Sequence, residues 1–387
     1  MKQSRLLRTG FTTGSCASAA AKAAAVFLLT GKSPETVEIH LPDGQTAAWE
    51  PRYFAESGWG VRKDAGDDPD VTDGAWICAS VKMVDGKNWE KLLAHGRGYF
   101  LEEFPDFYLD GGTGIGIAQL PGLSCPVGHY AINPVPRRMI LSAVAEACTA
   151  AGWEGRLHVI VSIPEGAVLA EKTFNPRVGI RGGISVLGTT GIVEPMSETA
   201  LLETIRLEIH MKAVSGLRRL LMTPGNYGET FLLETLGVPL GEAVKCSNFV
   251  ADAVEAAASE GFTRMLFVGH IGKLVKVAGG VRNTHSAYGD RRMELMETLT
   301  REVLDAGADG EDLLGRIRGC NTTEEAVGIL VENGLAQAVL THTAVAVKRW
   351  MEHWSQGKTT VEVIVFSSAY GIAGMTERET RILQGVL

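Results

Sequence analysis

Apolar residues in the first half of the chain form patterns that predict both helices and strands. Helical spacing occurs over 16–29, where Ser15 is a suitable N-cap, and again over 136–151. Strand patterns occur at 37–41, 75–83, 107–109 and 157–163. A glycine-rich passage, 179–191, closes this half. The pattern predicts an α+β domain over residues 1–196.

The second half of the chain has a different rhythm. A helical pattern over 196–212 leads into it, and short apolar runs then each end in a loop of small residues. The runs are 217–222, 243–246, 264–268 and 360–366, with helices predicted over 229–236 and up to residue 259. Strand, loop and helix in this order are typical of a parallel, doubly wound sheet. Residues 197–387 are therefore predicted to form an α/β domain.

The loops that follow these runs are candidate ligand sites, because ligands of parallel sheets bind outside the carboxyl ends of the strands. Gly225-Asn226-Tyr227-Gly228 offers backbone that a ligand can approach, followed by the N–H groups of a helix start. Gly269-His270-Ile271-Gly272-Lys273 adds a positive charge and an imidazole. Neither loop has the Walker or the GxGxxG pattern. Each is equally consistent with a plain strand-to-helix turn.

Three features of the first half are candidate sites for ions. The loop 111–116 is rich in glycine, aspartates crowd 64–73, and Arg137 and Arg138 stand at a helix start, where positive charge is unfavourable without an anionic partner. Each feature also has a plain structural explanation, as a turn, a solvated loop or surface charge. No His, Cys, Asp or Glu set has the spacing of a metal site, so no resident metal is predicted.

Composition narrows the classes of function. The chain of 387 residues has 37 Lys and Arg against 45 Asp and Glu, a formal net charge of −8, and no basic run, which argues against nucleic-acid binding. The apolar stretch 17–29 contains Lys22 and is followed by a helix stop at 30–34. We therefore expect a buried helix and no membrane span or signal. Six cysteines without a CxxC pair indicate reduced thiols and a cytoplasmic location.

Eight stretches between Arg8 and Ser286 carry a more specific likeness. They are RTGFTTGSCASAAAKAA (8–24), KDAGDDPDVT (63–72), GGTGIGIAQLPGL (111–123), AINPVPRRMI (131–140), KTFNPRVGIRGGISVLGTTGIVEPMSE (172–198), GNYGE (225–229), KCSNF (245–249) and VGHIGKLVKVAGGVRNTHS (268–286). Together, and in this order, they resemble the cobalt-precorrin-5B C(1)-methyltransferase family of anaerobic cobalamin biosynthesis. The likeness is weaker beyond residue 286.

The resemblance implies methyl transfer from S-adenosyl-L-methionine to C-1 of cobalt-precorrin-5B, which gives cobalt-precorrin-6A. The cobalt belongs to the tetrapyrrole substrate, so the lack of metal ligands in the chain is consistent with it. The resemblance also implies an α+β first domain that binds the tetrapyrrole and a Rossmann-like second domain that binds the cofactor. Because the methyl group leaves a sulfonium, catalysis would depend mainly on alignment and on exclusion of water.

The resemblance and the loop positions together give three sets of candidate residues. The candidates for proton transfer are Asp67, Asp68, Glu194 and His270. The candidates for cofactor binding are Gly225, Asn226, Gly228, Ser247, Asn248, Gly269, Gly272 and Lys273, and valine at Gly225 or Gly228 is expected to weaken cofactor binding while sparing the fold. The candidates for tetrapyrrole binding are Thr12, Thr13, Asp67, Asp68, Gly114, Gly116, Asn133, Arg137, Arg181, Thr189 and Thr190.

Two other functions stay open at this point. One is a nicotinamide-dependent reductase of a corrinoid intermediate, which the missing GxGxxG pattern disfavours. The other is a non-catalytic tetrapyrrole carrier, which would bind the macrocycle but not S-adenosyl-L-methionine. In addition, Ser247-Asn248 occupies the position at which an acidic residue usually binds the ribose hydroxyls. The position of the cofactor's adenosine therefore stays open. The oligomeric state is open as well, a homo-oligomer and transient contacts with other cobalamin-pathway enzymes included.

Overall fold

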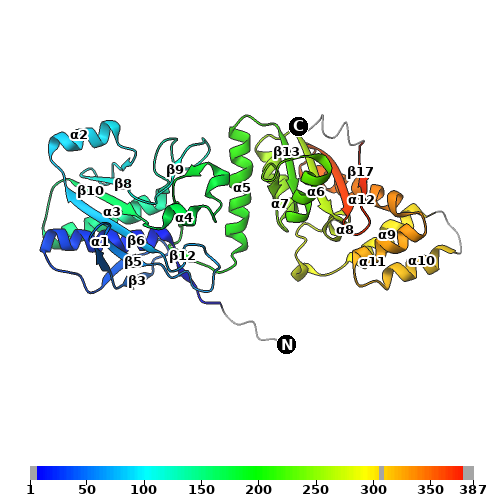
Figure 1. The fold of residues 1–387 in the computed structure, drawn as a ribbon, viewed down its shortest axis with the longest axis horizontal. Coiled ribbons are helices and arrows are strands. Elements are labelled where there is room, and N and C mark those ends of the chain that lie inside the picture. The colour runs from blue at the N-terminus through cyan, green and yellow to red at the C-terminus, as the bar shows by residue number, and fades with distance from the viewer. Residues whose placement is uncertain (1–6, 305–308, 378–387) are drawn as a thin grey trace. The chain divides into compact units, whose positions relative to one another are not determined.

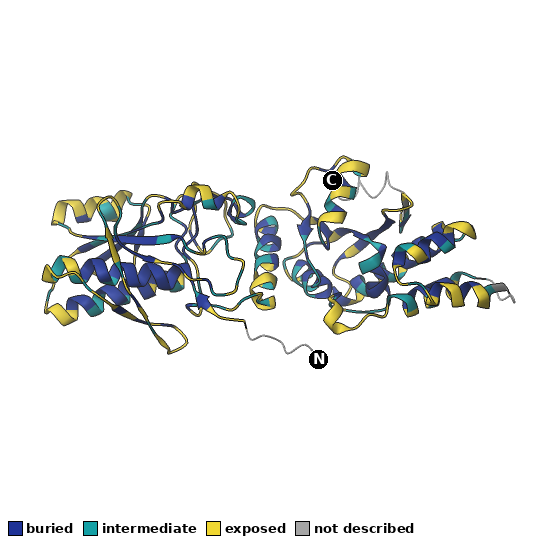
Figure 2. Ribbon diagram, turned by 60° about the horizontal axis from the view of Figure 1, so that its bottom comes forward, coloured by how far each residue is buried: buried dark blue, intermediate teal, exposed yellow. Residues whose placement is uncertain are grey.

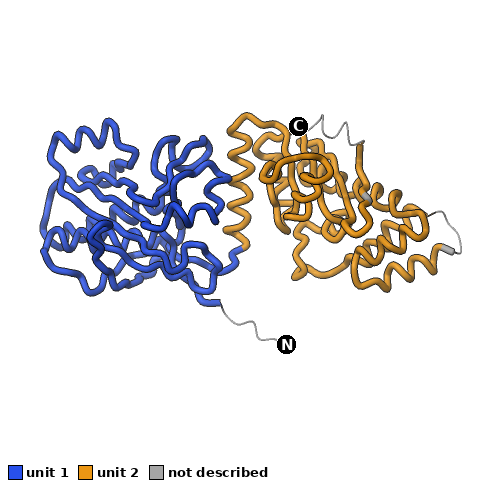
Figure 3. Tube along the Cα trace, viewed as in Figure 1, with its two compact units in different colours: residues 1–197 blue, residues 198–387 orange. Residues whose placement is uncertain are grey.

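A computed structural model describes residues 7–304 and 309–377, and the chain forms two compact units, residues 1–197 and 198–387 (Figure 3). The sequence pattern predicts the boundary after residue 196. Each unit combines helices with a β-sheet and has its own buried core (Figures 1 and 2). The predicted mixture of helices and strands is therefore confirmed.

The first unit is built on a six-stranded sheet with the order β4-β5-β6-β10-β8-β7. Its strands are β4 (Arg52–Phe54), β5 (Gly58–Arg62), β6 (Trp76–Met83), β10 (Leu157–Ser162), β8 (Phe107–Gly111) and β7 (Tyr99–Phe100). Neighbouring strands pair antiparallel, except β10 and β8, which are parallel. The sequence pattern predicts β6, β8 and β10 but not β4, β5 and β7, which are short and lie toward the edges of the sheet.

Two long helices, α1 (Thr13–Thr30) and α3 (Pro134–Ala151), pack on one face of this sheet. Alternate residues of β10, such as Val159 and Val161, point into this core. The alanines of α1 have no bulk beyond Cβ, so the two helices and the sheet approach closely. Helix α1 is long and apolar enough to cross a membrane by length and composition, and 67% of it is buried inside the unit.

Helix α1 starts earlier than its sequence predicts. Its N-cap is Thr12, whose Oγ1 accepts the N–H of Ser15 at 3.3 Å. The prediction of Ser15 as the cap is wrong, because Ser15 lies in the first turn and donates its hydroxyl to the carbonyl of Gly191 at 2.7 Å. Both residue types cap helices well, and the contact with Gly191, 176 positions away, is not visible in local sequence.

Shorter elements complete the first unit. They are the hairpin β2 (Val37–His40) and β3 (Thr46–Trp49), the pair β1 (Gly10–Phe11) and β12 (Ile192–Val193), the pair β9 (Ile117–Ala118) and β11 (Ile180–Arg181), the helices α2 (Gly86–His95) and α4 (Gly166–Ala170), and the 3-10 turn η1 (Asn175–Val178). The pairs β1–β12 and β9–β11 tie the start of the unit, its middle and its end together.

The second unit contains a five-stranded sheet with the order β14-β13-β15-β16-β17. Its strands are β14 (Val244–Lys245), β13 (Arg219–Thr223), β15 (Arg264–His270), β16 (Thr360–Ser367) and β17 (Ile372–Met375). The first four are parallel and β17 is antiparallel to β16. The sequence pattern predicts each of the four parallel strands.

Helices cover both faces of this sheet. Helix α6 (Asn226–Leu236) packs on one face, and α5 (Glu198–Val214), α7 (Val250–Ser259), α8 (Ile271–Ala278) and α12 (Ala336–Trp354) pack on the other. Between α8 and α12 the chain adds η2 (Ser286–Tyr288) and the helices α9 (Arg292–Val303), α10 (Asp309–Arg318) and α11 (Thr323–Glu332) (Figure 1). The sequence predictions contain no element in this added segment.

Candidate functional site

The carboxyl ends of β13, β15 and β16 lie along one edge of the second unit's sheet, because these strands are parallel neighbours. Strand β13 ends at Thr223, β15 at His270 and β16 at Ser367. Strand β14, on the other side of β13, ends at Lys245. Gly269 is the last but one residue of β15, and the other predicted cofactor residues follow one of these strand ends, so the fold gathers them at this carboxyl edge.

The loop after β13 is open at Gly225. A Cβ atom added to this glycine would meet no heavy atom within 4 Å, and its φ of 171° is extended backbone. Its carbonyl accepts the N–H groups of Gly228 and Glu229 at the start of α6. Among the described residues, no acceptor lies within hydrogen-bond distance of the N–H groups of Asn226 and Tyr227. These two groups can donate to a ligand.

A charged pair holds Asn226 at this edge. Lys245 Nζ lies 2.9 Å from Glu229 Oε2 and donates to Asn226 Oδ1 at 3.3 Å. The ring of Tyr227 is exposed beside them, and its centroid lies 6.0 Å from that of His270. The loop after β13 therefore presents free backbone donors, a fixed amide and an accessible aromatic ring.

Gly228 and Gly269 have packing roles instead of open backbone. A Cβ atom on Gly228 would lie 1.8 Å from Thr223 Oγ1 and 2.9 Å from the carbonyl of Val268. A Cβ atom on Gly269 would lie 2.9 Å from the side chain of Leu274. The expectation that valine at Gly228 would spare the fold is therefore wrong.

Ser247 and Lys273 bridge the edge of the sheet. Ser247 has a φ of 54°, in the left-handed region that residues other than glycine rarely adopt. Its carbonyl accepts a hydrogen bond from Lys273 Nζ at 3.3 Å, so this lysine reaches from α8 to the end of β14. Burial lowers the pKa of Lys273, and the nearby charge of Lys276 lowers it further. A strained residue and a half-buried cation in contact are typical of a ligand site.

Asn248 and Gly272 have partners within the protein. Asn248 Oδ1 accepts the hydroxyl of Thr284 at 3.2 Å, and its carbonyl accepts the Thr284 N–H at 2.9 Å. The N–H of Gly272 donates to Nδ1 of His270 at 3.0 Å, which caps α8. Both residues therefore fix the shape of the carboxyl edge.

His270 is held at both ring nitrogens. Because Nδ1 accepts from Gly272, the ring proton sits on Nε2, which lies 2.5 Å from Oε1 of Glu324. The other oxygen of Glu324 accepts the hydroxyl of Ser367 at 2.5 Å. No lone pair of the imidazole is free, which argues against the predicted role of His270 in proton transfer.

Glu324 and Ser367 are residues of this edge that the three sets of candidate residues did not include. Glu324 lies in the first turn of α11, 54 positions from His270, and is brought to the sheet by helices with no predicted counterpart. The available signal was the capping box of α11, in which Thr322 and Glu325 satisfy each other's backbone N–H groups. It marks the helix start next to Glu324 but not its contact with β15.

The predicted tetrapyrrole loops of the first unit are interlocked by backbone hydrogen bonds. The bonds run from Thr12 N–H to Gly191 O, from Gly14 N–H to Leu187 O, from Gly116 N–H to Ile184 O and from Asn133 N–H to Val186 O. The segment 184–191 therefore contacts the start of α1, the loop after β8 and the start of α3. These loops form one cluster, which we call the loop hub (residues 8–14, 63–73, 111–118, 130–133 and 179–196).

Asp67 and Asp68 accept hydrogen bonds from the first and the last segment of the loop hub. Asp67 Oδ2 accepts the backbone N–H of Arg8 at 2.8 Å, and Asp68 Oδ2 accepts that of Met196 at 3.0 Å. The guanidinium of Arg8 also bonds to Asp64 and lowers the pKa of that carboxyl. These contacts give Asp67 and Asp68 structural roles and argue against their predicted part in proton transfer.

A buried ion pair stabilises the same loop. The ammonium of Lys63, which is 3% exposed, contacts Asp70 and donates to the hydroxyl of Thr72 at 2.6 Å. The pKa of Asp70 is lowered, because the attraction of Lys63 and the hydrogen bonds from Thr72 outweigh the opposing effect of burial. The aspartate-rich loop is thus a folded structure with internal partners, and the interpretation as a freely solvated loop is wrong.

Four other predicted tetrapyrrole residues are packed inside the loop hub. Thr12 and Thr13 are 5% and 3% exposed and bond to the backbone of their own helix or of Leu187. A Cβ atom on Gly114, whose φ is +73°, would lie 1.8 Å from the carbonyl of Ile163. On Gly116 it would lie 2.4 Å from the side chain of Ile180. The glycines here allow close contact between loops.

Arg137 and Asn133 also have structural partners. The guanidinium of Arg137 is buried, donates to the carbonyls of Ile132 at 2.6 Å and Ser124 at 3.2 Å, and lies 3.5 Å above the ring of Tyr99. Asn133 Oδ1 accepts the hydroxyl of Ser124 at 3.2 Å. The structure therefore argues against Arg137 as a clamp for substrate carboxylates.

Besides Asp67, four predicted residues remain accessible on the loop hub. Arg181, Thr189, Thr190 and Glu194 are exposed. Thr190 uses its hydroxyl to bond the backbone of Ile192, and no hydrogen bond or ion pair within the described residues engages the side chain of Glu194. These four residues and Asp67, whose Oδ2 accepts the N–H of Arg8, are the exposed members of the predicted substrate and proton-transfer sets.

All six cysteines are free thiols, five of them buried and Cys320 partly exposed. Burial raises the pKa of Cys16 and of Cys246 to about 12, and that of Cys78 to about 11. Over residues 7–304 and 309–377, no three His, Cys, Asp or Glu side chains are grouped to hold a metal ion.

Comparison with known proteins identifies the family. Two family models match, CbiD over residues 1–195 and the CbiD C-terminal domain over residues 283–377. A cobalt-precorrin-5B C(1)-methyltransferase of Ruminiclostridium cellulolyticum is 39% identical over 95% of this chain and 91% of its own length. A protein of the same name from Alkaliphilus metalliredigens is 37% identical over 99% and 96%.

The crystal structure of the cobalamin biosynthesis protein cbiD from Archaeoglobus fulgidus is 26% identical, covers 76% of this chain and 84% of its own, and superposes with a TM-score of 0.38. The sequence relatives span nearly the whole chain, and the family models match both units. The chain belongs to the cobalt-precorrin-5B C(1)-methyltransferase family, CbiD.

Proposed function

We propose that the chain transfers a methyl group from S-adenosyl-L-methionine to C-1 of cobalt-precorrin-5B, giving cobalt-precorrin-6A in anaerobic cobalamin biosynthesis. The observation that carries this proposal is family membership over nearly the whole chain, with relatives that bear the name of this activity. A small-molecule corrinoid is the acceptor, and the enzyme acts in the cytoplasm.

The carboxyl edge of the second unit fits the methyl donor, whose sulfonium supplies the activated methyl group when bound. The N–H groups of Asn226 and Tyr227, beside the open Gly225, can hold its carboxylate, and Lys273 supplies a matching charge. The exposed ring of Tyr227 can cover the adenine. We assign donor binding to these four residues.

The topology of the second unit supports this assignment. Four parallel strands with helices on both faces support a Rossmann-like arrangement, and in doubly wound sheets ligands bind at the carboxyl edge beside the first strand. Here that first strand is β13, between β14 and β15. Gly225 follows β13, and Lys273 follows the neighbouring strand β15.

The loop hub of the first unit is the proposed site of the tetrapyrrole. Its exposed Arg181 can pair with a peripheral carboxylate, and Thr189 and Thr190 lie in the same exposed segment. Among the proton-transfer candidates, Glu194 keeps a carboxylate that is accessible and not engaged by the described residues. We propose that it accepts the proton that the macrocycle releases after methylation.

Under this mechanism the protein contributes position more than chemical groups. The acceptor carbon, the methyl group and the departing sulfur must lie in line, and water must be kept away. The hydrogen-bonded loops of the first unit and the fixed edge of the second unit are suited to hold each reactant in one orientation.

Calorimetric titration of the full chain with S-adenosyl-L-methionine and with NADPH tests the proposal. Saturable binding of the first alone is expected. Transfer of a deuterated methyl group to cobalt-precorrin-5B, followed by mass spectrometry, then tests the reaction itself. Binding of NADPH alone would instead support a reductase. Binding of the corrinoid without either cofactor and without turnover would support a carrier.

A further inference from the structure

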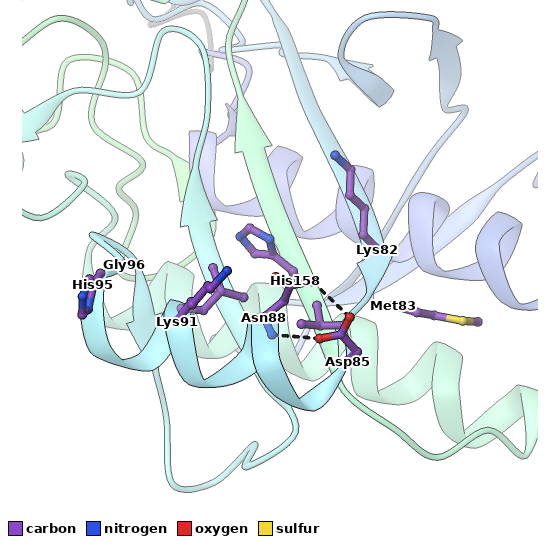
Figure 4. A pocket seen from close by; sticks show the side chains of 10 residues that line it. Lys82, Met83, Asp85, Asn88, Lys91, His95, Gly96 and His158 are labelled. Atoms are coloured by element: carbon purple, nitrogen blue, oxygen red, sulfur yellow. Dashed lines mark hydrogen bonds between the residues drawn. The ribbon is translucent and has the colours of Figure 1, made fainter.

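A pocket in the first unit is lined by residues outside the loop hub (Figure 4). It has a volume of about 460 Å³ and is bounded by the end of β6, the start of β10 and helix α2. Its lining residues are Lys82, Met83, Val84, Asp85, Asn88, Lys91, Leu92, His95, Gly96 and His158. None of them belongs to the predicted sites.

The pocket is at the opposite end of the sheet from the loop hub. In the pairing of β6 with β10, Lys82 is opposite His158, at the start of β10. Strand β10 then runs toward Ser162, whose neighbour Ile163 bonds to the loop after β8. The four residue steps from His158 to Ser162 span roughly 13 Å, which sets the start of β10 apart from the strand end that reaches the loop after β8.

The pocket is lined by two lysines and two imidazoles, with one carboxylate among them. The side chains of Lys82, Lys91 and His95 form no hydrogen bond or ion pair with any described residue. Asp85 is the acid in the lining, and both of its carboxylate oxygens accept hydrogen bonds from Asn88, through the backbone N–H and the side-chain amide, to cap α2. Two lysines and the imidazole of His95 therefore line the cavity with no direct ion pair, beside the carboxylate of Asp85.

His158 is the fourth nitrogen group, and it is held in place from behind. Its Nε2 lies 3.1 Å from Oδ2 of Asp110 on β8, and the other oxygen of Asp110 accepts the N–H of Gly111 at 3.0 Å. Both side chains are less than one-fifth exposed. Within the described residues, Nδ1 of His158 has no partner, so the ring presents this atom to the pocket in a fixed orientation.

We propose that this pocket binds a small anion with several carboxylate or phosphate groups, contacted by Lys82, Lys91, His95 and His158. Four nitrogen groups from three elements line it, and charge-assisted hydrogen bonds to such an anion would engage them, with His158 acting in the complex as the imidazolium that donates Nε2–H to Asp110 and Nδ1–H to the anion. The site does not depend on the proposed methyl transfer, since none of its lining residues belongs to the loop hub or to the carboxyl edge. Carboxylate and phosphate ligands share this chemistry, and the test distinguishes them.

The test is calorimetric titration of the full chain with inorganic phosphate and, separately, with propane-1,2,3-tricarboxylate. Saturable binding of at least one probe is expected. The double variant Lys82→Gln, Lys91→Gln should weaken it by about tenfold or more, because two charged contacts are lost. Lys87→Gln is the matched control, since Lys87 is on α2 but does not line the pocket. Far-UV circular dichroism checks that each variant is folded.

The outcomes separate as follows. Binding of the tricarboxylate alone assigns the site to a polycarboxylate, and binding of phosphate alone assigns it to a phosphate ester. If His158→Asn loses affinity for the probe to a similar extent as the double variant, the proposal gains support. Lack of saturable binding with both probes, or equal weakening by Lys87→Gln, overturns the proposal. Unchanged affinity of the double variant for S-adenosyl-L-methionine is expected and keeps this test independent of the cofactor site.

Discussion

His270 and Glu324 form a hydrogen bond of 2.5 Å between Nε2 and Oε1, which joins the end of β15 to the first turn of α11. The same carboxylate also accepts from Ser367 at the end of β16. Two adjacent strand ends are thus connected through one side chain of the added helical segment. The contact holds the carboxyl edge of the sheet in shape.

Glu324→Gln is expected to lower the free energy of unfolding by about 1 to 3 kcal/mol. His270 Nε2–H and the Ser367 hydroxyl each donate to one oxygen of the carboxylate. In the variant one of these donors would face the amide NH₂, so one of the two part-buried contacts would become repulsive. Urea denaturation of the full chain measures the change. Glu332→Gln is the control, because its exposed pair with Arg316 contributes little, within about 0.5 kcal/mol. Equal effects of the two variants would contradict the assigned role.

Valine at Gly225 and valine at Gly228 are expected to act differently. At Gly225 the side chain has open space, so the fold should be kept while the affinity for S-adenosyl-L-methionine falls by about tenfold or more. At Gly228 it would collide with Thr223 and Val268 and lower stability by about 1 to 3 kcal/mol or more. Calorimetry and thermal unfolding measure the two effects. An unchanged affinity in folded Gly225→Val would refute the cofactor assignment.

Lys273→Met is expected to stabilise the unliganded protein at pH 7 while weakening donor binding. The pKa of Lys273 is lowered by burial, so its charged form is less favourable in the folded chain than in the unfolded one. That cost is present below the folded-state pKa and disappears as the pH rises toward the ordinary lysine value of about 10.4. Urea midpoints at pH 7 and above pH 10 measure it. A variant less stable than wild type at pH 7 would contradict the argument.

Asp70→Asn is expected to destabilise the first unit by about 3 kcal/mol at pH 7, because it leaves the buried Lys63 without its counter-charge. The pKa of Asp70 is lowered in the folded state, so its contribution is present above about pH 4 and is lost as the pH falls through the folded-state value. The variant should therefore lose less stability than wild type between pH 7 and pH 3. Urea denaturation at both values tests this.

Glu103→Gln serves as the control for that experiment, since Glu103 is exposed. Between pH 7 and pH 3 its free energy of unfolding should change as that of wild type does, within about 0.5 kcal/mol. If the free energy of unfolding of Asp70→Asn shows the same pH dependence as wild type, the pair between Lys63 and Asp70 contributes nothing measurable to stability.

The parallel strands of the second unit could be predicted because each is a short apolar run followed by a small-residue loop, a local signal. The contact between His270 and Glu324 could not, because it joins residues 54 positions apart through helices without a predicted counterpart. Polar stretches such as α10, whose sequence is DGEDLLGRIR, carry only a narrow apolar stripe. Helix packing, rather than local pattern, brings Glu324 to the sheet.

The role of Arg137 shows a signal that the sequence did contain. Arg137 precedes Leu141 and Val144 by one and two helical turns, and all three are buried on the same face of α3. That spacing predicts an inward-facing guanidinium, whereas its neighbour Arg138 is exposed. Its carbonyl partners, by contrast, come from a loop whose course no local pattern specifies.

The distribution of the thiols has a practical consequence for labelling. Cys16 and Cys246 are buried and their pKa values are raised, so they form little of the thiolate that reacts with maleimides. Cys320, at the end of α10, is the partly exposed thiol, although its pKa is also raised by burial. A fluorophore at this position would sit in the second unit's added helical segment without engineering of the other five cysteines. The native chain can thus be used directly for fluorescence measurements of that segment.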